Sequence, residues 1–65
     1  MKHQRIRLLM LMQFLLQKEM FGQKKMIMKD MVIIYSKLII QVNMLTPEQV
    51  KGSNSLMQSK AEIYL

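Results

Sequence analysis

The chain has 65 residues and a net charge of +6, with no cysteine, one histidine and 51% hydrophobic residues. This length allows one small domain, and the composition excludes a disulfide framework and a zinc site built from four Cys or His ligands. A core of this size is marginal by itself, so we expect oligomerisation or docking on a partner to add stability. The absence of cysteine fits a reducing compartment, and we expect a cytoplasmic protein.

The first predicted helix covers about residues 3–20. Leu, Met and Phe fill this stretch without Gly or Pro, and its polar side is thin. Gly22 then suits a helix-terminating position. The apolar run over residues 8–16 follows basic residues, as a signal peptide does, but no small-residue cleavage site comes after it. Nine residues are also too few to span a bilayer.

The second predicted helix covers about residues 24–43 and is apolar around most of its circumference. Gly22, Lys29, Ser36 and Asn43 recur every seven residues, so they form one narrow polar strip. Lys37, near the middle of the most apolar stretch, makes a transmembrane span costly. We therefore expect this helix to lie near the centre of a homo-oligomer, with a dimer favoured. The predicted interface residues are Met31, Ile34, Leu38, Ile39 and Val42.

A C-terminal helical region is predicted over about residues 47–64. In Thr46-Pro47-Glu48-Gln49, Thr46 can cap the helix, Pro47 fits its first position and Gln49 can complete a capping box. The run from Lys51 to Ser55 weakens the helix, and Ser55 with Gln58 could form a second capping box. The region is therefore one interrupted helix or two short ones, and a shared apolar face favours a single bent helix.

These elements predict an all-α protein in a single domain over residues 1–65. It consists of an antiparallel helical hairpin and a shorter bent C-terminal helix, assembled as a dimeric helical bundle. A strand competes only at Val32-Ile33-Ile34, whose neighbours alternate poorly at period two.

The sequence offers no catalytic, cofactor-binding or metal-binding constellation. His3 has no carboxylate near it in sequence, and the four acidic residues are scattered. Met10 and Met12 have a spacing used by Cu(I) sites, but residues two apart do not share a helix face. We therefore predict a protein that is not an enzyme and that needs no cofactor.

The excess positive charge lies in the first half of the chain. Seven of the ten basic residues fall within residues 1–29, where Glu19 is the one acid. Such asymmetry is typical of binding to an acidic partner, a nucleic acid or an anionic lipid surface. The predicted basic patch contains Arg5, Arg7, Lys24, Lys25 and Lys29. We expect these side chains to be mostly solvated.

Part of the second half carries a family resemblance. Leu38-Ile39, then Leu45-Thr46-Pro47-Glu48-Gln49-Val50, then Leu56 and a tyrosine near the end make residues 31–65 resemble a known helical hairpin. That hairpin belongs to the small aspartyl-phosphate phosphatases that control sporulation in bacilli. The family's motif carries Ser-Gln and an Asp three residues after the Ser. Residues 54–58 lack this acid, so the resemblance does not extend to the residue that would act.

The function predicted from the sequence is a non-enzymatic regulator or adaptor that self-associates or binds a partner protein through apolar helix faces. One alternative is a basic amphipathic peptide at membrane surfaces, because Arg5, Arg7 and Lys18 accompany Leu and Phe in the first helix. A further alternative is a DNA-binding helix-turn-helix that opens at Leu45. Its candidate recognition segment, residues 53–65, has Lys60 as its one cation, so nucleic acid is not an expected partner.

Overall fold

The computed structural model describes residues 2–21 and 28–65. These residues form three helices, α1 (Lys2–Phe21), α2 (Met28–Met44) and α3 (Pro47–Glu62), and contain no strand. The all-α prediction is therefore confirmed for the described part of the chain. The expected start of the second helix at residue 24 lies outside the described residues.

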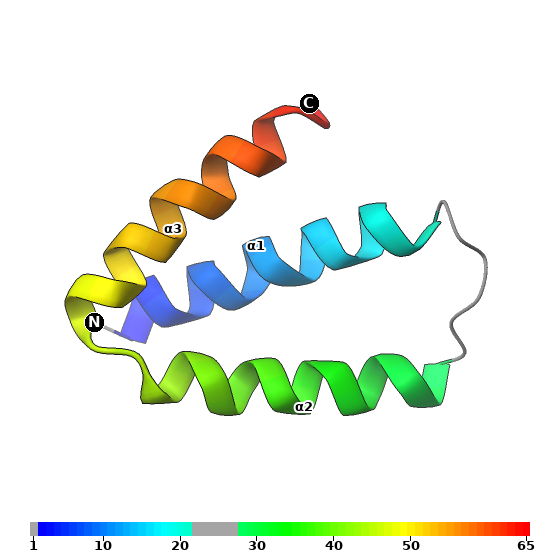
Figure 1. Cartoon of the computed structure of the whole chain (residues 1–65), viewed down its shortest axis with the longest axis horizontal. Coiled ribbons are helices and arrows are strands. Elements are labelled where there is room, and N and C mark those ends of the chain that lie inside the picture. The colour runs from blue at the N-terminus through cyan, green and yellow to red at the C-terminus, as the bar shows by residue number, and fades with distance from the viewer. Residues whose placement is uncertain (1, 22–27) are drawn as a thin grey trace.

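Helix α1 occupies the middle of the arrangement, with α2 along one side and α3 along the other (Figure 1). Helix α1 runs antiparallel to α2, which is compatible with the predicted hairpin. It is in contact with α3 over more residues than with α2. Within this chain α1, and not the more apolar α2, has neighbours on two sides. One physical reason is that α1 places leucines on both flanks of its buried line, so it can face two helices at once.

The core lies where the end of α2 and the start of α3 meet α1. Each helix contributes one side chain that is only 1% exposed, namely Leu8, Val42 and Val50. Leu9, Met12, Leu45 and Met57 pack against these three residues from partly buried positions. A core this small leaves much apolar surface uncovered.

The predicted cap of α3 is confirmed. The Gln49 backbone N–H donates to Thr46 Oγ1 at 3.2 Å, and the Thr46 N–H donates to Gln49 Oε1 at 2.9 Å, with Pro47 in the first turn. This exchange satisfies backbone donors that a helix start leaves without partners.

Helix α3 then continues without a break through Gly52. The second capping box at Ser55 does not form. Ser55 Oγ donates instead to the Lys51 carbonyl, one turn earlier in the same helix, at 3.3 Å. The element is therefore one helix and not two short ones.

Further side-chain contacts join α3 and the residues that follow it to α1 beyond the core. Near the start of α1, the buried Asn54 donates from Nδ2 to the Gln4 backbone carbonyl at 2.8 Å and to Gln4 Oε1 at 3.1 Å. Near its end, the rings of Phe14 and Tyr64 meet edge to face with centroids 6.3 Å apart. Lys18 Nζ lies 5.5 Å from the Phe14 centroid, within cation–π range.

Candidate functional site

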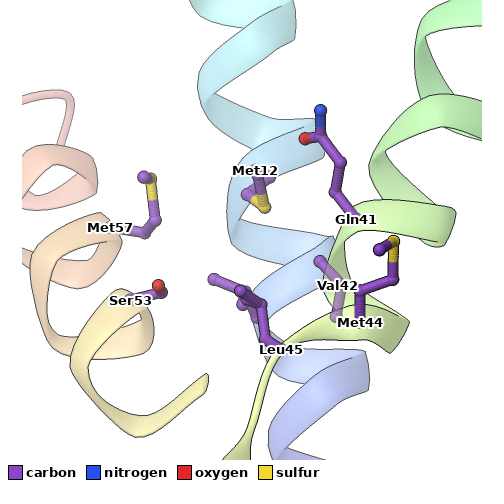
Figure 2. A pocket seen from close by; sticks show the side chains of 8 residues that line it. Met12, Gln41, Val42, Met44, Leu45, Ser53 and Met57 are labelled. Atoms are coloured by element: carbon purple, nitrogen blue, oxygen red, sulfur yellow. The ribbon is translucent and has the colours of Figure 1, made fainter. Parts of the chain in front are cut away.

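An apolar groove runs over α1 between α2 and α3. One part of it has a volume of about 330 Å³. Figure 2 shows Met12 of α1 between Gln41 of α2 and Met57 of α3, with Leu45 below them. Leu8 and Val42 also line this part, so it borders the core directly.

A second hollow of about 230 Å³ continues the groove toward the end of α1. Met12 and Met57 line both hollows, and Ile34 with Leu38 forms the α2 wall of the second. Methionine is unbranched and adaptable, and it is common where a surface must fit different apolar partners. The groove can therefore hold the apolar side chains of another helix.

The structure places the five predicted interface residues in different environments. Val42 is buried in the chain's own core, and Ile34 and Leu38 line the groove against α1. Met31 is half-buried, while Ile39 is exposed. The interface prediction therefore needs correction at Val42, whose side chain is already covered by α1 and α3. The interface itself stays a prediction.

The outer face of α2 carries apolar side chains that nothing in the described chain covers. Four large side chains on it are between 47% and 60% exposed, and they are Val32, Ile33, Ile39 and Ile40. Exposed apolar side chains gathered on one helix face often mark a contact with another molecule. We call these four residues the outer α2 face.

The seven-residue polar strip runs through the outer α2 face. Lys29, Ser36 and Asn43 are all exposed. The predicted polar strip is therefore exposed to solvent at these three positions. Of the apolar side chains beside the strip, only Ile39 was among the predicted interface residues, although the seven-residue spacing of Val32 with Ile39 could have revealed the others.

Arg5 overturns part of the basic-patch prediction. Its guanidinium donates from Nη1 to the Val42 carbonyl at 2.6 Å and from Nη2 to the Leu45 carbonyl at 2.7 Å. The side chain is half-buried, so the expectation of a mostly solvated arginine is wrong here. The reason is that the carbonyls at the end of α2 attract a cation, and the last turn of α2 has none of its own.

The other basic residues do not gather around Arg5. Arg7 is exposed and donates from Nη2 to Gln58 Oε1 at 3.1 Å. Lys29 is exposed in the first turn of α2, at the opposite end of a helix roughly 25 Å long. Lys24 and Lys25 lie outside the described residues. Arg5 and Lys29 therefore do not belong to one patch.

A polar hollow of about 420 Å³ opens between α1 and α3 on another side of the molecule. Arg7 and Lys51 flank it, and both are exposed. Asn54 forms part of its lining, and Asn54 Oδ1 is buried without a hydrogen-bond partner among the described residues. Water can reach both cations, so ordinary hydration accounts for them.

Neither metal ligands, nor a membrane span, nor similarity to a known protein points to a further site among the described residues. Among the described residues, no three His, Cys, Asp or Glu side chains are grouped to hold a metal ion. No described helix has the length and apolar character needed to cross a membrane. No protein-family model matches the chain, and neither a curated protein nor a solved structure matches it.

Proposed function

We propose that this chain is a non-enzymatic interaction protein, a small regulator or adaptor, that binds through apolar helix faces and self-associates. The observation that supports this function best is the outer α2 face. Four large apolar side chains on one helix are exposed there. Exposed apolar side chains grouped on one face in this way often mark a protein–protein or membrane contact.

The groove over α1 supplies a second contact surface in this proposal. It is lined mostly by apolar side chains, including Met12 and Met57. A helix laid in such a groove presents side chains at positions i, i+3, i+4 and i+7 to the receptor. Two separate apolar surfaces would let one small chain join two protein segments, as an adaptor does.

Analytical ultracentrifugation over a range of concentrations tests the proposal. The parent should sediment above its monomer mass of 7.8 kDa as concentration rises. Ile40→Asp should return it to the monomer without loss of helical circular dichroism, because Ile40 is 60% exposed. The matched control is Met10→Asp on α1, where the parent side chain is 64% exposed. A parent that stays monomeric at every concentration would contradict self-association.

Binding to an anionic membrane surface is the second candidate function. The structure changes which helix would carry it, because α1 uses Leu8 and Leu15 in packing and Arg5 in the contact with α2. On α2, by contrast, Lys29 and Lys37 are exposed on the same helix as the outer α2 face. Apolar side chains flanked by lysines are typical of a helix lying in the membrane interface.

Vesicle sedimentation separates the two candidates. Membrane binding predicts a monomer in buffer that pellets with anionic vesicles and much less with neutral ones. The preferred function predicts an oligomer in buffer and little protein in either pellet, because self-association covers the outer α2 face.

A further inference from the structure

The outer α2 face is nearly symmetric about Ser36. Val32 and Ile40 lie four residues to either side of Ser36, and Ile33 and Ile39 lie three residues to either side. All five of these residues are exposed. A surface whose pattern reads almost alike in both directions is suited to pairing with itself around a two-fold axis.

Helical geometry sorts these side chains into two rows. At 3.6 residues per turn, Val32 and Ile39 fall on one side of Ser36, and Ile33 and Ile40 fall on the other. Residues seven apart lie almost in line along a helix, which is the repeat used by helix pairs. The face is therefore a polar centre line between two short apolar rows.

We infer that a second copy of this chain covers the outer α2 face, with the two α2 helices antiparallel and the two-fold axis at Ser36. The inference deepens the proposed function and rests on it. Each apolar row then packs against the same row of the second copy, which runs in the opposite direction. Val32 packs beside Ile39 of the second copy, and Ile33 packs beside Ile40 of the second copy.

Ser36 suits the point of closest approach. Its side chain is small, so the two helix backbones can come close together at the axis. Its hydroxyl already donates to the Val32 carbonyl at 2.9 Å. Burying this serine therefore leaves no hydroxyl donor without a partner.

Charge selects the antiparallel orientation. Lys29 lies seven residues before Ser36, and Asn43 lies seven residues after it. Antiparallel pairing places each Lys29 near Asn43 of the second copy, at the partially negative C-terminal end of that α2 helix. Parallel pairing in register would instead set Lys29 against the same lysine of the second copy, and like charges at that range repel.

The expected dimer is reversible. Standard stable interfaces bury about 1,600 Å² in total, and one helix laid against one helix covers less than this. We therefore expect a dissociation constant in the micromolar range and a mass that depends on concentration.

Disulfide trapping tests the orientation, because the chain has no native cysteine. The two variants are Lys29→Cys and Asn43→Cys, both at exposed positions. Facing Cα atoms of helices packed about 8–10 Å apart come within disulfide reach. Each variant is oxidised alone and in an equal mixture, and peptide mass spectrometry identifies the linked cysteines.

The antiparallel dimer predicts a 29–43 disulfide in the mixture and little product from either variant alone. Effective concentrations within a complex are of millimolar order, so the 29–43 product should exceed the collisional product of a Met10→Cys control by at least about tenfold. Adding Ile40→Asp to both variants should remove this excess.

Three results would overturn the inference in different ways. Dominant 29–29 and 43–43 products would indicate a parallel pair, and self-association would still stand. An oligomeric parent without any excess of these cross-links would place the contact elsewhere, and the proposed function would survive. A monomeric parent without cross-links would refute both the dimer and self-association.

Discussion

Arg5 joins the first turns of α1 to the turn between α2 and α3. Its two bonds reach the carbonyls of Val42 and Leu45, which are 37 and 40 residues away along the chain. Hydrogen bonds from a charged donor are stronger than neutral ones, and this donor also faces the partially negative end of a helix. One side chain thus fixes where α2 ends relative to α1.

Removing this contact should lower stability. Arg5→Ala should reduce the free energy of unfolding by about 1.5–2 kcal/mol, the lower part of the range for hydrogen bonds to charged groups, because Arg5 is half-buried. Arg5→Lys should recover less than half of the loss, since an ammonium lacks the two-pronged geometry of guanidinium. Urea denaturation measures both. Arg7→Ala is the control, and equal losses for Arg5→Ala and Arg7→Ala would contradict the role of Arg5.

The Thr46 cap gives a second prediction at a single residue. Thr46→Ala removes the acceptor of the Gln49 N–H and should lower the free energy of unfolding by about 1 kcal/mol. Thr46→Ser keeps a hydroxyl and should retain most of the stability. Thermal denaturation of the three proteins measures the difference, and a Thr46→Ala protein as stable as the Ser variant would argue against the cap.

Helix α3 is informative as an element because it contains a glycine in its interior. Gly52 is exposed, and a Cβ built there would meet nothing within 4 Å. Glycine costs a helix interior about 0.5–1 kcal/mol relative to alanine, mainly through the entropy of the unfolded chain. The packing of α3 on α1 outweighs this local weakness.

Gly52→Ala should therefore raise the free energy of unfolding by about 0.5–1 kcal/mol. The gain requires one continuous helix through this position. If the chain instead broke at Gly52 and restarted at Ser55, alanine would be neutral or harmful there. Chemical denaturation decides between the two outcomes, and Gly52→Ser should fall between parent and alanine variant because serine is a poorer helix former.

Whether the sequence could predict a contact between elements depends on how far apart its partners lie along the chain. The capping box of α3 was predictable because its partners, Thr46 and Gln49, lie three residues apart. The Arg5 contact was not, because its partners lie far along the chain. The wide apolar circumference of α2 was also evident, but Val32 and Ile34 are equally apolar. Only the packing on α1 decides that Ile34 turns inward and Val32 outward.

In the molecule as a whole, some apolar side chains form the core and others remain exposed on the surface. Leu8, Val42 and Val50 hold the three helices together, while the outer α2 face remains open. A domain of this size buries about 60% of the surface that its unfolded chain exposes, so stability is marginal. Covering the open face would stabilise the folded state further, by an amount that grows with protein concentration.

Two isoleucines on opposite sides of α2 separate folding from association. Ile34 faces the groove over α1, and Ile40 is 60% exposed on the outer α2 face. Ile34→Asp places a carboxylate against apolar side chains, which should cost about 1–3 kcal/mol of folding free energy. Ile40→Asp keeps the carboxylate in water in the monomer, so the free energy of unfolding at high dilution should change by less than about 0.5 kcal/mol.

The two variants should give opposite results in circular dichroism and in sedimentation. Ile34→Asp should lose helical circular dichroism or melt at a lower temperature, even in dilute solution. Ile40→Asp should keep its helices and sediment as a monomer where the parent associates. High salt should leave the parent's association intact, since apolar contacts are not screened, while any binding that rests on the lysines should weaken. If the two variants behaved alike in both measurements, the two sides of α2 would not have separate roles.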